Sequence, residues 1–273
     1  MIYRIRARRR DRRQRTLLAG VAALLLALTF TAAWTGDAWA HPEDDFCEAD
    51  SGLDPELCRQ LAAANSGDRQ ATGPILDEDG NVRSPLDTAL MYVKIGVQHI
   101  LPGGTDHILF VLALFLASER LRSLFIQISA FTVAHTATLG LAAAGVIQPP
   151  ASIVEPLIAL SIAFVAIENI FLRDISKWRP AVVFGFGLFH GLGFAGFIRD
   201  VGLPPGQFWS SLIGFNLGVE FGQLSVVAAA LLATTLVRRF VTNLSYRTAI
   251  VIPASALIAL VGLWWTASRT FGF

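Results

Sequence analysis

Residues 100–116 read ILPGGTDHILFVLALFL, a Pro-Gly-Gly turn followed by an acid-imidazole pair and then by an unbroken apolar run. The run predicts a helix that lies in lipid, and Asp106 and His107 stand at its start. Ionisable side chains at membrane depth are costly, and they usually bind an ion or a substrate or relay protons. Aspartate beside histidine is a common pair for divalent metals. We therefore expect the functional site at this turn, together with His99 just upstream.

The composition places the chain among polytopic membrane proteins. Hydrophobic residues make up 53% of the chain and charged residues 16%, whereas a soluble domain carries about 25% charged residues. The net charge is only +1, and the charges lie in the tail and loops and not in a basic patch, which excludes nucleic acid as a partner. The expected partners are a metal ion and membrane lipid.

Residues 1–40 have the layout of a signal peptide. An arginine-rich start is followed by the apolar run 17–33 and by Ala-Trp-Ala at 38–40. This pattern predicts cleavage after Ala40. The alternative is an uncleaved signal anchor, because Asp37 and two tryptophans interrupt the segment before the cleavage site.

Residues 41–87 form a polar arm that we expect outside the membrane. The arm is rich in Asp, Glu, Gly, Pro and Asn, has at most a short helix near 55–64, and is too polar to form a core of its own. Cys47 and Cys58 are the two cysteines of the chain and both fall here. They can close a disulfide in an oxidising compartment, and free thiols are the alternative.

Residues 88–273 predict an all-α bundle of about six transmembrane helices. The approximate bounds of the apolar spans are 105–119, 122–146, 152–172, 180–199, 208–237 and 247–268. A bilayer requires about 20 residues for each span. The first span is therefore short unless the amphipathic stretch 89–101 joins it, and that stretch can also lie at the membrane interface.

Basic residues alternate between the loops. Arginine and lysine follow spans one, three and five, whereas the loop at 148–150 carries none and 198–208 carries only Arg199. By the positive-inside rule the basic loops face the cytoplasm. The mature N-terminus then lies outside a bacterial-type inner membrane, in agreement with export by a signal peptide.

His135 lies near the middle of span two, in the segment FTVAHTATL at 131–139. Helical spacing places Thr132 and Thr136 on the same face as this histidine. We interpret His135 as a metal ligand. The alternative is that its ring donates a hydrogen bond to a neighbouring carbonyl.

His190 lies among glycines in span four, within FGFGLFHGLGFAG at 184–196. The spacing of Gly187 and Gly191 is a helix-packing signal in membrane proteins. Close approach of another helix would bring His190 to a ligand cluster, and we favour that interpretation over a packed core histidine.

Polar residues of spans three and five complete the candidate site. Asn216, Glu220 and Gln223 share one helix face, and we assign Glu220 to the buried site with the two amides in support. Glu155 is either a supporting group beside Asp106 or a helix-start carboxylate favoured by the macrodipole. Glu168 either pairs with a basic residue of the following loop (Arg173 or Lys177) or forms an inner relay. Span six is expected only to pack.

The predicted metal ligands come from spans one, two, four and five, with Asp106 and His107 near the outer face and His135 at mid-membrane. Imidazole and carboxylate without thiolate suit Ni(II), Co(II), Zn(II) or Fe(II) and argue against a soft Cu(I) site. The full set of predicted ligands is His99, Asp106, His107, His135, His190 and Glu220, and the set of supporting groups is Glu155, Asn216 and Gln223.

Four segments between about 88 and 235 resemble the HupE/UreJ-type membrane family, specifically its second branch. They are Gly-x-x-His99…Gly104-x-Asp106-His107-x-x-Phe110, Phe131-Thr-x-Ala-His135-x-x-Thr-Leu139, Phe186-Gly-Leu-x-His190-Gly-x-Gly-Phe194 and Phe215-Asn-x-Gly-Val-Glu220-x-Gly-Gln223. Members of the broader family are regarded as nickel or cobalt permeases associated with hydrogenase and urease. Their His-x5-Asp-His motif implies that His99, Asp106 and His107 bind metal here, although six residues separate His99 from Asp106 in this chain.

Two functions use the same residues. In a divalent-metal permease, the motif residues capture the ion outside, and His135, His190 and Glu220 pass it inward through sites weak enough to release it. In an intramembrane zinc-dependent hydrolase, three ligands hold the metal and Glu220 or Asp106 activates its water. The resemblance favours the permease.

Overall fold

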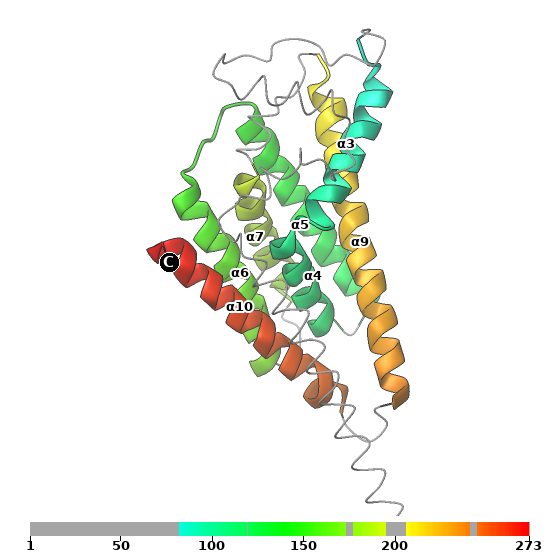
Figure 1. Cartoon of the computed structure of the whole chain (residues 1–273), viewed down its shortest axis with the longest axis vertical. Helices are drawn as coiled ribbons and strands as arrows, with labels where there is room; N and C mark the ends of the chain where they lie inside the picture. The colour runs from blue at the N-terminus through cyan, green and yellow to red at the C-terminus, as the bar shows by residue number, and fades with distance from the viewer. Residues whose placement is uncertain (1–81, 119, 173–176, 195–205, 241–244, 273) are drawn as a thin grey trace, which may run out of the picture.

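The computed structural model describes residues 82–118, 120–172, 177–194, 206–240 and 245–272 (Figure 1). Their helices are α3 (Pro85–Ile100), α4 (Thr105–Ala117), α5 (Leu121–Ala143), α6 (Ala151–Phe171), α7 (Arg179–Gly193), α9 (Phe208–Phe240), the π-helical turn η2 (Arg247–Val251) and α10 (Ile252–Phe271). The predicted all-α membrane bundle is confirmed. The signal peptide, nearly all of the polar arm and both cysteines lie outside the described residues.

Four helical stretches are long and apolar enough to cross a membrane, namely α5, α6, α9 and η2 with α10. A fifth span results when α3 and α4 are taken together, since they form a pair bent by 73° at a short break. The remaining predicted span begins with α7, and its last five residues, 195–199, lie outside the described residues. The bent pair is consistent with the expectation that residues 89–101 join the first span.

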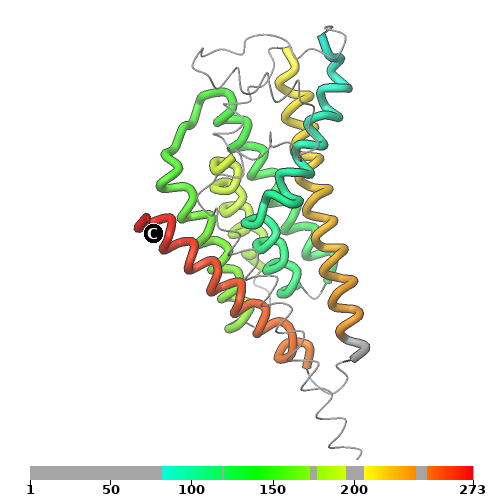
Figure 2. Tube along the Cα trace, viewed as in Figure 1, coloured from blue at the N-terminus to red at the C-terminus, as the bar shows by residue number. Residues whose placement is uncertain are grey.

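The break between α3 and α4 lies inside the bundle (Figures 1 and 2). α3 begins with Pro85 after Ser84, whose hydroxyl caps the backbone N–H of Asp87 at 3.2 Å. It ends before Pro102, which cannot continue a helix. Gly104 then lies so close to the carbonyl of His99 that a side chain would not fit. This turn thus lets two half-length helices meet at the level of the histidines.

α3 is packed into the helical bundle. It runs parallel to α9, with the backbone of Gly96 against Phe215 and that of Gly218 against Val93. One turn nearer the start of each helix, Gly214 lies against Ala89. Small residues at four-residue spacing allow this approach. Helix packing, and not an interfacial polar face, therefore fixes α3.

The bundle consists of three closely packed helix pairs, α3 with α9, α5 with α7, and α6 with α10 (Figure 1). Gly187 and Gly191 place α7 directly on the backbone of α5 at Phe131 and His135. This confirms the predicted role of the Gly187-x-x-x-Gly191 spacing. In the third pair, Gly262 of α10 lies against the backbone of α6.

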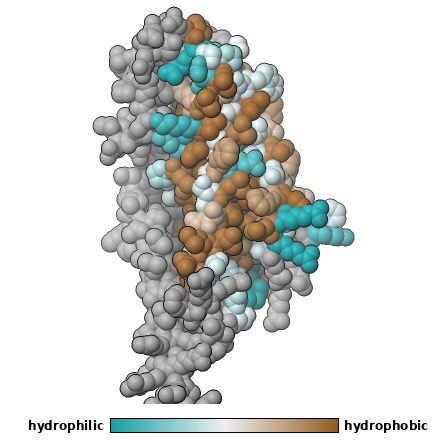
Figure 3. All heavy atoms as spheres, turned by 90° about the vertical axis from the view of Figure 1, so that its right-hand side faces the viewer, coloured by the Kyte–Doolittle hydropathy of each residue, from teal (hydrophilic) through white to brown (hydrophobic). Residues whose placement is uncertain are grey.

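The outer surface of the bundle carries many large apolar side chains. Figure 3 shows apolar residues along most of the described part of one face, with polar residues gathered toward its ends. Exposed apolar side chains of this size are unfavourable in water but not in lipid. Examples from four helices are Val133, Phe164, Leu217, Phe221, Leu260 and Trp264.

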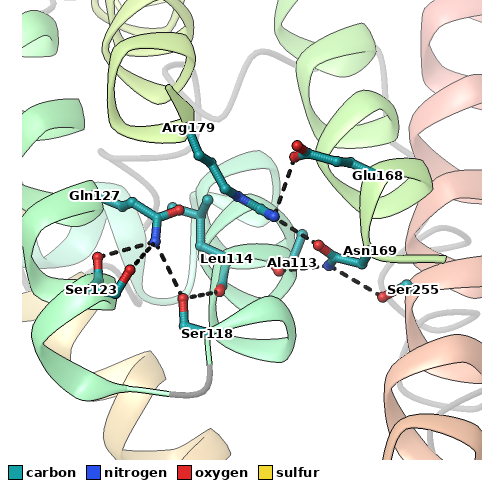
Figure 4. A network of polar contacts seen from close by, with 9 residues as sticks. All are labelled: Ala113, Leu114, Ser118, Ser123, Gln127, Glu168, Asn169, Arg179 and Ser255. Atoms are coloured by element: carbon teal, nitrogen blue, oxygen red, sulfur yellow. Dashed lines mark hydrogen bonds and ion pairs between the residues drawn. The ribbon is translucent and has the colours of Figure 1, made fainter. Parts of the chain in front are cut away.

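A polar network ties several helices together at the end of the bundle where α4 and α6 finish and α7 begins (Figure 4). Arg179, 3% exposed, pairs with Glu168 at 3.2 Å and donates to Asn169 Oδ1 at 2.9 Å. Asn169 donates in turn to the Ala113 carbonyl at 2.8 Å and to Ser255 at 3.3 Å. The described partner of Glu168 is thus Arg179, which begins the next helix, whereas the predicted partner Arg173 lies outside the described residues.

Candidate metal centre

Three histidines from three helices meet at the break in the first span. His99 lies in the last turn of α3, His107 in the first turn of α4, and His135 in the middle of α5. One ring nitrogen of each lies within 4.8 Å of those of the other two, and all three side chains are buried. We call these residues the histidine trio. The break brings the trio together because it places residues from both of its sides at one depth.

The rings of the trio face one another at short range. The centroids of His99 and His107 lie 4.7 Å apart, those of His107 and His135 5.7 Å, and those of His99 and His135 6.2 Å. The sequence predicts two stations, an outer one at Asp106 and His107 and a deeper one at His135. The structure instead gives one cluster, because α3 already descends part of the bundle before the turn.

Each member of the trio has a buried nitrogen without a partner. The Nε2 atoms of His99, His107 and His135 make no hydrogen bond to any residue that the structure describes. Buried polar atoms are almost always satisfied, and each exception calls for an explanation. A metal ion bound to these nitrogens would supply the missing partner, and neutral imidazole is a ligand for Zn, Ni and Co. The residues present therefore fit a metal.

Asn216 orients the ring of His135. The amide nitrogen of Asn216 donates to the Leu212 carbonyl at 2.8 Å, so its oxygen faces His135 Nδ1 at 3.3 Å. A carboxamide oxygen only accepts, and Nδ1 must therefore carry the proton. This leaves the Nε2 lone pair of His135 free for a metal, the arrangement that supporting residues commonly impose on ligating histidines.

His190 stands beside the trio with the opposite nitrogen available. Its ring centroid lies 5.0 Å from that of His107. The hydroxyl of Ser161 donates to the Ile158 carbonyl at 2.7 Å, so its oxygen accepts from His190 Nε2 at 3.0 Å. Nδ1 is then unprotonated, and it is buried without a partner among the described residues. His190 is thus a second available ligand beside the compact trio.

Aromatic rings enclose the cluster. Phe194 lies 3.9 Å from His99 between ring centroids, and Phe215 stacks on Phe194 at 5.0 Å. On the other side, Phe131 lies 5.0 Å from His190, and Phe110 lies 5.1 Å from it. These four phenylalanines are buried. Such walls exclude water and strengthen electrostatic interactions within the site.

Asp106 is turned toward α10 and is not in the compact group of ligand atoms. Its two carboxylate oxygens accept from Arg269 Nη1 at 2.9 Å and Nη2 at 3.1 Å. Arg269 Nη1 also lies 3.3 Å from the backbone oxygen of Glu155. Arg269 therefore links Glu155 to Asp106, which agrees with the expectation that Glu155 lies beside Asp106. The expectation that span six only packs is wrong at its last turn.

The polar face of α9 contributes support more than ligands. Asn216 and Gln223 are both buried, and Gln223 Oε1 accepts from Thr132 at 3.2 Å. Glu220 is half-buried and is not part of the compact group of ligand atoms. The two amides therefore brace α5 around His135, whereas Glu220 is not brought to the trio.

Sequence reasoning does not find Ser161 or Arg269. Serine is common in membrane helices, where its hydroxyl bonds to the preceding turn, so Ser161 carries no signal of its own. Arg269 reads as an interfacial anchor at the end of an apolar helix. No charged residue lies between Arg247 and Arg269. A charged partner for Arg269 therefore has to come from another helix, and this is the signal that the sequence offers.

Comparison with known families gives one match. The sequence model of the family described as HupE / UreJ protein matches residues 77–269, which is most of the chain and covers the helices named above except the last two residues of α10. Comparison with curated proteins and with solved structures gives no match.

Proposed function

We propose, from the premise that this chain belongs to the HupE/UreJ family, that the histidine trio binds a divalent transition metal and that the protein moves this ion across the membrane as a nickel- or cobalt-type permease. The observation that carries the proposal is the convergence of three buried histidines, each with one ring nitrogen within 4.8 Å of those of the other two and each with an Nε2 atom that has no partner among the described residues. Nickel or cobalt as cargo rests on the resemblance to the family.

The break between α3 and α4 favours a transport role for the trio rather than a purely structural metal site. The trio lies where α3 gives way to α4. Membrane transporters commonly bind substrate near the bilayer midplane at such interruptions. His99 and His107 belong to different helical segments, so a change in the angle between α3 and α4 would separate these two ligands and release the ion.

The ligand set also suits a transported ion. Neutral imidazoles bind Ni(II), Co(II) and Zn(II) without the tight hold of thiolates. Conduction requires a site that is favourable enough to fill and weak enough to empty. His190, whose Nδ1 is also available, gives the ion a neighbouring ligand when it leaves the trio.

The intramembrane zinc hydrolase is a second candidate because three histidines and an open position are the ligand set of many catalytic zinc sites. That reaction also requires a carboxylate able to activate the bound water. Asp106 is engaged by Arg269, and Glu220 is outside the compact group. The hydrolase therefore has less support than the permease.

Metal accumulation by cells tests the proposal. We expect His107→Ala and His135→Ala to abolish uptake of limiting Ni(II) or Co(II) by cells that depend on this protein. His41→Ala is the matched control, since His41 is the histidine of the polar arm and its loss should leave uptake unchanged. Uptake that survives both cluster substitutions at normal protein levels would overturn the permease. A tightly held zinc that survives chelation would favour the hydrolase.

The orientation belongs to the same proposal. We place the start of α3 outside the bacterial-type inner membrane and the loops after α4, α6 and α9 in the cytoplasm, as the positive-inside rule predicts. Cysteines introduced singly at Val82 and at Arg122, in a protein whose Cys47 and Cys58 are replaced by serine, give a direct test. An impermeant thiol reagent added to intact cells should label the first and not the second, and the reverse pattern would overturn the orientation.

A further inference from the structure

Arg269 reaches the metal centre from the far end of the chain. It lies in the last turn of α10, 163 residues from Asp106, and holds that carboxylate with both of its terminal nitrogens. The two side chains are 19% and 20% exposed, so neither is fully solvated. A bidentate arginine-carboxylate pair is strong and specific in geometry. The contact is therefore a built feature of the site and not a surface ion pair.

The pair determines the charge that a metal meets. The trio offers neutral imidazoles, and Asp106 is the carboxylate that directly precedes His107. While Arg269 holds Asp106, the two opposite charges largely cancel, and the Asp106 carboxylate is not part of the compact group of ligand atoms. The Glu155 carboxylate also lies within electrostatic range of Arg269. A divalent cation at the trio then meets neutral ligands beside an Asp106 carboxylate whose charge the guanidinium already compensates.

We infer that Arg269 is an affinity-setting residue that withholds the Asp106 carboxylate from the transported cation and so keeps the histidine site weak enough to release it. This inference rests on the proposed metal permease. It assigns a specific task to the C-terminal helix, which otherwise packs mainly against α6 and accepts a hydrogen bond from Asn169 at Ser255. Asp106 then has two competing partners, the guanidinium and the metal.

The sign of the effect follows from Coulomb attraction. Replacing Arg269 by a neutral residue leaves Asp106 negatively charged beside His107. An unpaired carboxylate attracts a divalent cation whether or not it becomes a ligand, and in a partly buried site the gain should be at least about tenfold in affinity. A residue that merely positioned Asp106 as a ligand would have the opposite effect, because its loss would weaken binding.

Titration of purified full-length protein in detergent with Co(II) alone tests the inference, with the visible absorption of the bound ion as the signal. We expect Arg269→Gln to bind Co(II) at least about tenfold more tightly than the natural protein. The double variant Asp106→Asn/Arg269→Gln should lose this gain. Arg269→Lys retains the positive charge but loses the two-pronged guanidinium contact, so its Co(II) affinity should lie between those of the natural protein and Arg269→Gln. This variant keeps the test available if Arg269→Gln does not fold.

Arg247→Gln is the matched control at the opposite end of the same helical stretch. Arg247 donates to the Ile170 carbonyl at 2.9 Å and has no described contact with the trio. Its replacement should leave Co(II) affinity unchanged. In cells, Arg269→Gln should lower the maximal rate of uptake although it binds more tightly, because release becomes slower.

The outcomes separate the two proposals. Unchanged or weaker Co(II) binding by folded Arg269→Gln and Arg269→Lys, with binding still abolished by His135→Ala, overturns the role of Arg269 and leaves the metal site standing. A gain in affinity that persists in the double variant also overturns it, because Asp106 would then not be the group released. Absence of Co(II) and Ni(II) binding by the natural protein overturns the proposed function itself.

Discussion

The side-chain oxygen of Asn216 lies 3.3 Å from Nδ1 of His135, across 81 residues of sequence. This contact assigns the tautomer of a buried imidazole, because the amide nitrogen of Asn216 is already committed to the Leu212 carbonyl. It joins α9 to α5 at the metal centre. The orientation of one ligand is thus set by a helix that contributes no ligand to the trio.

Asn216→Ala should weaken metal binding without removing a ligand. Loss of an outer partner of a ligating histidine commonly lowers metal affinity about 10–100-fold. We expect a shift of this size in Co(II) titration of the purified protein. Asn216→Asp keeps an accepting oxygen and adds a negative charge beside the ligand, so its affinity should be at least that of the natural protein, and equal losses in both variants would contradict the tautomer argument.

Metal should stabilise the folded protein through the trio. A ligand that binds only the folded state at 100 times its dissociation constant adds about 2.7 kcal/mol of stability. Addition of Ni(II) or Co(II) should therefore raise the thermal midpoint of the detergent-solubilised protein, and a chelator should reverse the rise. His135→Ala should show no such rise, whereas His41→Ala should behave as the natural protein.

Gly218→Val should disrupt the packing of α3 on α9. A Cβ at Gly218 would meet the backbone of Val93 and of Gly96, neither of which can yield cheaply. Overpacking of this kind typically costs about 1–3 kcal/mol, and more where backbone must move. Gly185→Ala is the matched control, because nothing lies within 4 Å of a Cβ there. Thermal unfolding and yield of folded protein in detergent compare the two.

Arg179→Met should destabilise the bundle at its network end. The change leaves Glu168 without its partner and Asn169 without a donor to its oxygen. Removing one member of a buried ion pair typically costs about 3–5 kcal/mol, whereas replacing both members by apolar residues can be nearly neutral. Arg179→Met/Glu168→Leu should thus recover much of the lost thermal stability. A double variant as unstable as the single one would argue against pairing as the cause.

The helical architecture and the histidines of the candidate site are visible in local sequence signals. Apolar runs of sufficient length predict α5, α6, α9 and α10, since lipid requires every backbone group to be satisfied within a helix. The Pro-Gly-Gly turn predicts a break before Asp106. The glycines at 187 and 191 predict the close approach of α7, which the structure confirms.

The sequence does not predict how deep the break lies or which charges pair across the bundle. The depth of residues 101–104 depends on the packing of α3 along α9. That packing uses Gly214 and Gly218, whose four-residue spacing is visible in the sequence but does not indicate that α3 is the partner helix. The bond from Arg269 to Asp106 spans most of the helical domain. Such contacts depend on tertiary geometry, which no local pattern encodes.

The turn at residues 101–104 makes the affinity for the ion depend on the angle between α3 and α4. His99 lies on α3 and His107 on α4, two helices bent by 73° relative to each other, so the separation of the two histidines changes with the angle between the helices. A cation held by both nitrogens must favour one angle over others. By linkage, anything that favours another angle, such as membrane thickness or a bound partner, must lower the affinity for the cation by the corresponding factor. The affinity for the metal would then change with the membrane thickness or the bound partner that sets the angle between α3 and α4.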